Sequence, residues 1–429
     1  MELRTCHKFW LSVAMYTHRE INLRHFEAVA IAGRTGSISN AALAMNLSQP
    51  AVTQAVAKVE AQVGYNLLER QPGGVVMTPA GALMTERIER ALAYIVKGGQ
   101  GVRRSARLPV LPNIERRITL SQLRALTAVD QAGSFALASK VTGLSEPALH
   151  RSARELEQLL GILLLTRHGR TVQPTPAAAH LLRFAQLAFA EFEAGFDELA
   201  ALRLEGAGRI TIGTLPMAQA ILLPRALARF SSAYPAAKIT VLEGPYPDLL
   251  TNLRTGQMDV LIGAIREPAP SKDVVQEELF DDDLVIVARA CHPLTMEHDF
   301  DYSRLRDFPW IIAASRAPMR VRWDEMFSER GIVPPAMRIE SNSVAISRGL
   351  MLSDDWLTLM SRDQFILERR AGLLVEVPSA FSSQRKIGLT VRDDWRPTRL
   401  QAAFVAEFRR ACSDWTSEKL MARNSFRYA

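Results

Sequence analysis

The sequence of 429 residues lacks any long apolar run. No apolar stretch reaches the roughly 18–20 residues that a membrane-spanning helix needs, which argues against a membrane protein. The first 20 residues hold a short apolar patch from Phe9 to Tyr16, but charged residues flank it closely. A signal peptide has a cleaner apolar core and a small-residue cleavage site. We therefore predict a cytoplasmic protein whose residues 1–20 are an unassigned extension, with Met15 as an alternative start.

Cysteine is scarce in this chain. Cys6, Cys291 and Cys412 lie far apart, and no CxxC pair or Cys/His cluster accompanies them. This spacing argues against a zinc site, and we predict neither a metal nor a cofactor. A redox switch between Cys291 and Cys412 is one interpretation. We favour the other, which is two unrelated thiols in a reducing cell.

Catalytic signatures are also missing. The sequence contains no GxSxG, P-loop or HExxH pattern. His292 precedes a Pro-Leu turn and has no nearby nucleophile. The run Asp281-Asp282-Asp283 resembles a metal-binding run, but it precedes a predicted strand, and we interpret it as a solvated turn. We therefore predict that the protein is not an enzyme.

Positive charge is concentrated in the first half of the chain. Residues 1–207 hold 23 Lys and Arg against 17 Asp and Glu, whereas residues 208–429 hold 29 against 28. Much of the excess lies in residues 101–117, where five arginines accompany one glutamate. A basic half joined to a neutral half is typical of a nucleic-acid-binding part joined to a part with another function.

Residues 23–64 have the pattern of three short helices. Gly36 follows the first, Ser37 is a good N-cap for the second, and Ser48 caps the third, with Pro50 in its first turn. The third helix carries one apolar stripe at spacings of four, three and four residues and ends at Gly64. A short helix, a turn and a capped helix with one stripe predict a helix-turn-helix. A plain helical bundle is the alternative.

The face opposite this stripe carries polar side chains suited to DNA. Gln can pair with adenine, Thr can touch a thymine methyl group, and a helix N-terminus favours phosphate. A turn at Gly73-Gly74 predicts a wing beside the helix. We call this predicted helix-turn-helix with its wing the first head. Its predicted DNA contacts are Ser48, Gln49, Thr53, Gln54, Lys58 and Arg70.

This region resembles the winged helix-turn-helix of LysR-type transcriptional regulators. It departs from the family at Met45, where Leu is usual, and at Thr53, where Ser is usual. In that family a long linker helix follows and pairs with another copy of the protein. Here the linker stripe runs from Met84 to Ile95, and Gly98-Gly99-Gln100-Gly101 predict its end. The resemblance is carried by Gly36-Ser37-Ile38, Ala41-Ala42, Ser48-Gln49-Pro50-Ala51-Val52-Thr53, Glu60, Gly64, Leu67-Leu68, Arg70 and Thr78-Pro79-Ala80-Gly81.

The same pattern recurs 97 residues later without a gap. Gly133-Ser134-Phe135 repeats Gly36-Ser37-Ile38, and Ser145-Glu146-Pro147 repeats Ser48-Gln49-Pro50. A gapless match of buried, capping and turn positions predicts an internal duplication of one folded unit. The buried stripe recurs as Leu149, Ala153, Leu156 and Leu160.

The exposed face of this second head differs from that of the first. Gln49 is replaced by Glu146, which would repel phosphate, whereas several new arginines would attract it. Two interpretations remain open. We favour a head with different base preferences over a degenerate head kept only for packing. The predicted contacts are Ser145, His150, Arg151, Arg154, Arg167 and Arg170.

A second linker helix follows the second head. The intervening basic linker, residues 98–117, reaches roughly 25 Å as a flexible chain, and a 20-residue helix is about 30 Å long. We therefore predict that the two linker helices can pair antiparallel within one chain and make a pseudo-dimeric DNA-binding unit. The apolar stripe of the second helix comprises Leu181, Ala185, Ala188, Phe192, Phe196 and Leu199.

From Gly208 onwards, strands alternate with helices. This alternation predicts a doubly wound sheet, and the segments 386–391 and 400–410 are expected to return to the first lobe. Two lobes joined by two crossings predict a clamshell like that of periplasmic binding proteins. The predicted strands include 209–215, 238–242, 259–262 and 284–288, and the predicted helices include 222–230, 247–253, 321–330 and 343–352.

This half resembles the LysR-type effector domain, through segments such as Gly208-Arg209-Ile210-Thr211-Ile212-Gly213 and His292-Pro293-Leu294. It is similar to the subgroup of regulators of sugar-binding proteins and aromatic catabolism at Pro216, Leu222-Leu223-Pro224 and Ile262-Gly263-Ala264. Ligands of open α/β sheets bind beyond the carboxyl ends of strands. Hydroxyls at helix N-termini suit an anionic or hydroxylated ligand, and arginines pair with carboxylates. The alternative is that each residue is only a cap or a surface charge. The predicted effector contacts are Thr214, Leu215, Met217, Gly263, Ala264, Arg266, Ser315, Arg316, Ser343 and Val344.

The sequence therefore predicts an α/β multidomain protein with two winged helix-turn-helix domains (residues 21–97 and 118–204) and a two-lobed effector domain (208–420). The resemblance implies transcription regulation, in which the heads bind promoter DNA and a small metabolite changes promoter binding or DNA bending. RNA polymerase is a further candidate partner, and a homo-oligomer is expected. The alternative is a solute-binding protein or sensor whose helix-turn-helix units serve only oligomerisation.

Overall fold

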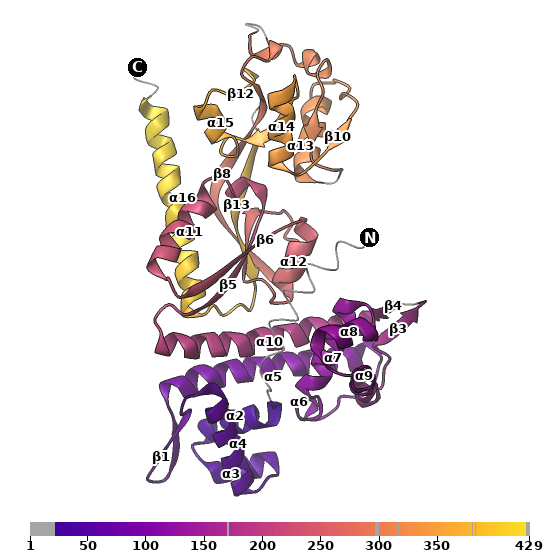
Figure 1. Cartoon of the computed structure of the whole chain (residues 1–429), viewed down its shortest axis with the longest axis vertical. Helices are drawn as coiled ribbons and strands as arrows, with labels where there is room; N and C mark the ends of the chain where they lie inside the picture. Colours follow the sequence, from indigo (N-terminus) through magenta and orange to yellow (C-terminus); the bar gives the residue numbers. More distant parts are fainter. Residues whose placement is uncertain are drawn as a thin grey trace. The chain divides into compact units, whose positions relative to one another are not determined.

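The computed structural model describes residues 22–169, 171–296, 300–315, 317–379, 381 and 383–425. The predicted extension at residues 1–20 lies outside this part of the chain, as do Arg170 and Arg316. The chain forms two compact units, one containing the helical first half and the other most of the α/β second half (Figure 1). Within the described residues, no helix is long and apolar enough to cross a membrane.

The first head consists of three helices and a two-stranded wing, as the sequence predicted. The hydroxyl oxygens of Ser37 and Ser48 cap their helices by accepting hydrogen bonds from the N–H groups of Asn40 (3.3 Å) and Ala51 (3.4 Å). Gly64 adopts the left-handed conformation (φ 72°) that ends the third helix. The elements are α2 (Leu23–Thr35), α3 (Ile38–Met45), α4 (Gln49–Val63), β1 (Leu68–Gln71) and β2 (Gly74–Met77).

The second head repeats this fold down to individual hydrogen bonds. The Glu60 carboxylate accepts a hydrogen bond from the N–H of Leu67 (2.7 Å), and the Glu157 carboxylate accepts the equivalent bond from Leu164 (2.8 Å). Each bond ties a recognition helix to its wing. The predicted internal duplication is therefore confirmed. The elements are α7 (Leu120–Ala132), α8 (Phe135–Thr142), α9 (Glu146–Leu160), β3 (Leu165–His168) and β4 (Thr171–Pro174).

A long linker helix follows each head, and the two helices pack against each other within the one chain (Figure 1). They are α5 (Pro79–Ser105) and α10 (Pro176–Arg203). Gly98 of α5 lies against Leu181 of α10, and Met84 lies against Gly195, so the helices run antiparallel. The predicted intrachain pair is therefore confirmed.

The prediction that Gly98 to Gly101 end the first linker helix is wrong, because α5 continues to Ser105. Glycine is a weak helix former, but here it permits close contact with α10. A Cβ on Gly98 would lie 2.9 Å from the Cβ of Phe184, and a Cβ on Gly101 would lie 2.1 Å from the Nε2 of His180. Packing between the helices therefore overrides the local preference.

The connection between the heads is ordered, which corrects the flexible basic linker predicted at 98–117. Gln100 of α5 donates a hydrogen bond to the carbonyl of Leu111 (2.6 Å) and accepts one from its N–H (3.3 Å). Arg116 pairs with Glu27 of α2 at 2.8 Å. The intervening helix α6 (Ile114–Arg117) buries Ile114 completely. Part of the positive charge of this segment is therefore used in contacts within the protein.

The second half contains the predicted α/β alternation around one mixed seven-stranded sheet, with the order β11-β8-β13-β7-β5-β6 and β12 beside β8. Strand β8 is longer than predicted, because its residues from Val274 to Leu284 pair antiparallel with β13 and the remainder pairs with β11 and β12. These two strands are the crossings between the lobes. The elements are β5 (Gly208–Thr214), α11 (Leu222–Ala233), β6 (Ala237–Glu243), α12 (Tyr246–Arg254), β7 (Val260–Ala264), β8 (Val274–Arg289), β13 (Ser383–Arg392) and α16 (Arg399–Ser425).

The second lobe is built around buried aromatic residues. The rings of Trp310, Trp323 and Phe327 meet edge to face, with centroids 5.0 to 5.9 Å apart. A short parallel pair of strands, β9 and β10, lies beside this cluster. The elements are β9 (Ile311–Ile312), α13 (Pro318–Ser328), β10 (Ile339–Glu340), α14 (Val344–Ser353), β11 (Thr358–Ser361), α15 (Ile366–Arg370) and β12 (Leu374–Glu376).

The interpretation of the three-aspartate run as a solvated turn is wrong, because the run lies inside β8. Asp282 is only 2% exposed, and its carboxylate lies 2.7 Å from the guanidinium of Arg385 on β13. Asp283 pairs with Arg362 at 3.0 Å. The run therefore supplies two ion pairs, of which the one between Asp282 and Arg385 joins the crossing strands β8 and β13.

Candidate DNA interface and effector site

The recognition helix of the first head, α4, packs against the rest of the head through one face only. Val52, Val56 and Val59 are buried in the head, whereas Thr53, Gln54 and Lys58 on the opposite face are exposed. The major groove of DNA is wide enough for one α-helix. The first head therefore presents a helix face that is free to enter such a groove.

The start of α4 and the wing frame this face. The Ser48 hydroxyl is occupied by capping, and the Gln49 amide donates a hydrogen bond to the Ser39 hydroxyl of α3. Arg70 is exposed on β1. The wing is fixed to the turn before α3, because the N–H of Val75 donates to the carbonyl of Gly36 at 2.9 Å.

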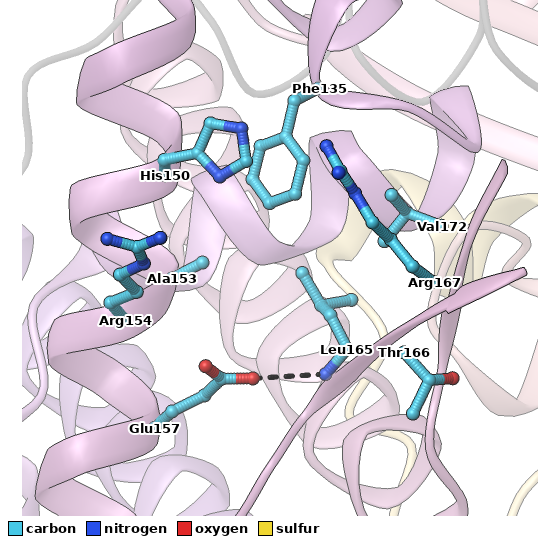
Figure 2. Close-up of a pocket in the computed structure, with 9 residues that line it drawn as sticks. All are labelled: Phe135, His150, Ala153, Arg154, Glu157, Leu165, Thr166, Arg167 and Val172. Atoms are coloured by element: carbon cyan, nitrogen blue, oxygen red, sulfur yellow. Dashed lines mark hydrogen bonds between the residues drawn. The ribbon is translucent and has the colours of Figure 1, made fainter. Parts of the chain in front are cut away.

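In the second head, one predicted contact residue packs against the head itself. Figure 2 shows the His150 ring stacked on Phe135, with centroids 3.6 Å apart and planes inclined by 19°. The Nε2 of His150 lies 3.7 Å from the Glu146 carboxylate. His150 is therefore half-buried, whereas the equivalent Thr53 is exposed.

Beside this stack, the recognition helix α9 and the wing enclose a small cavity of about 130 Å³ (Figure 2). Arg154 of α9 and Arg167 of β3 both line it and both reach the surface. Arg151 is exposed one turn earlier on α9. The helix and the wing thus bring three predicted cationic contacts to the surface of this head, while Arg170 lies outside the described residues.

Asp130 of α7 is a titratable group that the sequence did not single out. Burial raises the pKa of its carboxyl from 3.8 to about 6. The equivalent position in the first head is Gly33, which carries no side chain. The titration is therefore specific to the second head, and only a comparison of the repeats could have drawn attention to it.

In the first lobe of the effector half, most predicted contact residues belong to the core. Thr214, Leu215 and Met217 are 1%, 9% and 9% exposed. A Cβ on Gly263 would lie 2.6 Å from the Cδ1 of Leu215, so this glycine is required for packing. Ala264 ends β7 and is partly buried against the same apolar cluster.

Arg266 is different, because it is a cation stacked on an aromatic ring. Its guanidinium carbon lies 4.2 Å from the ring centroid of Tyr246. Burial lowers the pKa of Arg266, and the nearby positive charge of Arg385 adds to this effect. Its buried Nε has no hydrogen-bond partner among the described residues. Arg266 is therefore a partly buried cation held against Tyr246.

The predicted contacts of the second lobe lie beyond the ends of β9 and β10. The Ser343 hydroxyl caps α14 by accepting a hydrogen bond from the N–H of Ile346 (3.3 Å). Val344 is partly buried against a neighbouring apolar cluster, and Ser315 is exposed in the turn after β9. Arg316 lies outside the described residues, so its position is left open.

Comparison with known protein families identifies both halves. The bacterial regulatory helix-turn-helix family of the lysR type matches residues 22–82 and, a second time, residues 120–179. The LysR substrate binding domain matches residues 204–413. This chain belongs to the LysR family. It is a DNA-binding transcriptional regulator with a second half that senses a small-molecule effector.

Relatives in this LysR family differ in how much of the chain they match. The HTH-type transcriptional regulator GalR of Pseudomonas putida is 28% identical over 394 residues, which is 92% of this chain and 98% of the relative. PcaQ of Agrobacterium fabrum is 23% identical over 302 residues, which is 70% of this chain and 97% of the relative. The match to GalR is long enough to include both heads.

Solved structures show the same fold. A full-length OxyR variant from Pseudomonas aeruginosa is 23% identical, covers 68% of this chain and 98% of its own, and superposes with a TM-score of 0.52. CbnR, a LysR family transcriptional regulator, is 19% identical, covers 68% and 99%, and gives 0.50. These similarities support the two-lobed α/β effector half and a helical DNA-binding half.

Proposed function

We propose that both heads of this LysR-type regulator bind one promoter region, and that a small molecule bound by the clamshell changes that binding or the bending of the DNA. The observation that carries the proposal is that each recognition helix buries only its apolar stripe and leaves a polar or basic face exposed. In this division, residues 21–97 and 118–204 bind DNA and residues 208–420 bind the effector. No catalytic role is proposed.

In the first head, Gln49, Thr53 and Gln54 face base edges, and Lys58 and Arg70 contact phosphates. Gln pairs with adenine and the Thr methyl group fits beside thymine, whereas cations on the rim position the protein on the DNA backbone. Since the Ser48 hydroxyl is already bonded to the helix, its role is to orient the first turn of α4.

In the second head, Arg151 faces base edges, and Arg154 and Arg167 contact phosphates. Arginine pairs most often with guanine, so this head prefers a different sequence from the glutamine-rich first head. Ser145 caps α9 as Ser48 caps α4, at 3.4 Å from the N–H of Ala148. His150 is braced by Phe135 and shapes the surface between helix and wing.

In the effector half, Arg266 anchors a carboxylate or another anionic group of the ligand. Stacking on Tyr246 fixes the plane of the guanidinium, which presents paired N–H donors suited to a carboxylate. Ser315 and Ser343 of the second lobe offer polar groups to the remainder of the ligand. The effector is therefore a small anion, and RNA polymerase is a further candidate partner of the DNA-bound protein.

The test is DNA binding by the full-length protein as a function of salt. Neutralising phosphates releases counterions, so an interface with about 6–10 phosphate contacts loses about 10³–10⁵ in affinity between 50 and 200 mM salt. Fluorescence anisotropy on promoter fragments measures this slope, with unrelated DNA of equal length as the control. A salt-insensitive affinity contradicts the proposal and favours heads that serve only oligomerisation.

A further inference from the structure

Buried charges connect the two linker helices. Arg87 of α5 is 1% exposed and lies 2.8 Å from the carboxylate of Glu191 and 3.1 Å from that of Glu198, both on α10. Arg90, one turn further along α5, also bonds to Glu191 at 2.9 Å. The basic side chains of this group all belong to α5, and the acidic side chains all belong to α10.

The contact surface between α5 and α10 is called the seam. Apart from these charges, it has a near two-fold symmetry. The repeat offset of 97 residues maps Gly98 onto Gly195 and Met84 onto Leu181. Gly98 packs against Leu181, and Gly195 packs against Met84, so each contact is the counterpart of the other. Shape alone would therefore let either helix pair with a second copy of itself.

The charges remove that possibility. The same offset maps Glu191 onto Tyr94 and Glu198 onto Gly101. In an α5–α5 pair with this register, Arg87 would consequently face a tyrosine and a glycine instead of two carboxylates. A buried charge without a partner is strongly unfavourable.

The converse pair fails for the same reason. The offset maps Arg87 onto Phe184 and Arg90 onto Leu187. In an α10–α10 pair, Glu191 and Glu198 would face apolar side chains with no cation opposite them. Both like-with-like pairs are thus disfavoured, and only the unlike pair places Arg87 and Arg90 opposite Glu191 and Glu198.

We propose that the α5–α10 seam is specific for unlike helices, so that one chain carries a complete two-headed DNA-binding unit and does not share this seam with a second copy. Arg87, Glu191 and Glu198 are its specificity-determining residues. Homo-oligomers of the protein would then form through other surfaces.

Arginines near the ends of the two linker helices also contact the recognition helices. Arg103, near the end of α5, donates hydrogen bonds to the carbonyl of Pro109 (2.9 Å) and to the carbonyl of Leu160 at the end of α9 (3.0 Å). In the corresponding place on the other side, Arg203 of α10 bonds to the carbonyl of Gly64 at the end of α4. Each linker helix therefore supports the recognition helix of the other head.

A functional consequence rests on the proposed DNA binding. The two supported recognition helices differ at their exposed positions, with Gln54 in one and Arg151 in the other. A single chain would then read two unlike half-sites in a fixed order. A homodimer built on this seam would instead read two identical half-sites.

Engineered cysteines in the full-length chain test the seam without DNA. In a background with Cys6→Ser, Cys291→Ser and Cys412→Ala, the pair Gly98→Cys and Phe184→Cys reports the unlike contact, because a Cβ on Gly98 would lie 2.9 Å from that of Phe184. This is shorter than the roughly 3.5–4.5 Å between the Cβ atoms of a disulfide, so the two helices must move slightly apart for the bond to form. Oxidation is expected to give a cross-link within one chain, seen as a monomer-sized band on a non-reducing gel at every protein concentration.

Two single variants report the like pairs. Ala91 and Ala188 are equivalent under the offset and lie midway between the Met84–Gly195 and Gly98–Leu181 contacts, at the centre of the seam. Ala91→Cys alone would cross-link an α5–α5 pair, and Ala188→Cys alone an α10–α10 pair. Neither is expected to give a dimer, whereas the Ala91→Cys/Ala188→Cys double variant, the matched control, cross-links within one chain.

A dimer-sized product from either single variant would overturn the proposal. So would a dimer-sized product from Gly98→Cys/Phe184→Cys that persists on dilution, since it would place the unlike pair between two chains. The result is independent of DNA binding. A chain that cross-links as expected and yet ignores promoter DNA would contradict the proposed function and leave the seam proposal intact.

Discussion

Arg87 shows how much depends on single residues in the helical half. Its guanidinium is buried between two carboxylates of the neighbouring helix. Placing three charges in such a position is costly unless each one is paired. The seam is therefore tolerant of replacing all its charges together but intolerant of removing one of them.

Arg87→Ala is expected to lower the free energy of unfolding by about 3–5 kcal/mol, because it leaves buried carboxylates unpaired. Urea unfolding of the full-length protein, followed by circular dichroism, measures the change. Arg90→Ala is the matched control. Arg90 is 27% exposed, so its loss should cost clearly less. Arg87→Met combined with Glu198→Met should recover part of the stability, and equal losses in all three variants would contradict this account.

Asp130 makes the second head sensitive to pH. Its carboxyl has a pKa of about 6 in the folded protein against 3.8 without burial, so the folded state binds the proton more tightly than the unfolded state. This contribution to stability is fully present below about pH 4 and is lost as the pH rises through about 6.

Asp130→Asn is accordingly expected to stabilise the protein above pH 7, by up to about 3 kcal/mol. The advantage should shrink on acidification and disappear near pH 4. Thermal unfolding of the parent and variant proteins across this pH range measures the difference. An effect that is constant with pH would show that the substitution acts through packing and not through titration.

The recognition helices illustrate what is decided at the scale of an element. Both α4 and α9 have fifteen residues, a serine N-cap, a proline in the first turn and a glycine after the last turn. Their buried stripes are equivalent, so their positions in the two heads are equivalent. Their exposed faces are free to diverge, because those side chains contribute little to folding.

Substitutions on these faces should therefore change DNA recognition one head at a time. Gln54→Ala is expected to relax base preference in one half-site and Arg151→Ala in the other, each by about 1–3 kcal/mol of discrimination. Footprinting on promoter variants with single base changes measures both. Unchanged footprints for both variants would contradict a two-headed mode of binding, and a change for Gln54→Ala alone would identify the second head as a packing unit.

At the scale of the whole molecule, a signal must pass from the effector half to the heads. The ion pair of Asp282 with Arg385 joins the two strands that connect the lobes, and Asp283 on the same strand as Asp282 pairs with Arg362, which follows β11. A ligand that binds between lobes can shift an equilibrium only by its difference in affinity for two states. Arg266, on the segment that joins β7 to β8, is well placed to provide that difference.

Arg266→Met is expected to abolish the effect of a carboxylate effector while leaving DNA affinity without effector unchanged. Loss of a charge-assisted pair should weaken ligand binding by about 1.5–3 kcal/mol. A panel of small carboxylates and their uncharged amides, tested by thermal shift and then by DNA binding, measures the response. Lys272→Met, which removes an exposed cation, is the control. An unchanged response would place the anion site elsewhere.

The sequence by itself determined the elements of both heads. Caps at Ser37 and Ser48, the left-handed glycine at Gly64 and the apolar stripes are local signals, and they act over a few residues. The gapless repeat then predicted the second head from the first. In the effector half, the alternation of strands and helices predicted two lobes for the same reason.

Only the tertiary structure decided what these elements contact. Gly98 to Gly101 suggest a helix end locally, but α10 packs against them and the helix continues. Asp282 suggests a solvated turn, yet its partner Arg385 lies more than a hundred residues away. The sequence predicts His150 as a DNA contact, and only the structure shows that its ring stacks on Phe135. Local chemistry fixes where a helix begins and ends when nothing else touches it, whereas burial and charge pairing between distant segments decide which neighbours it keeps.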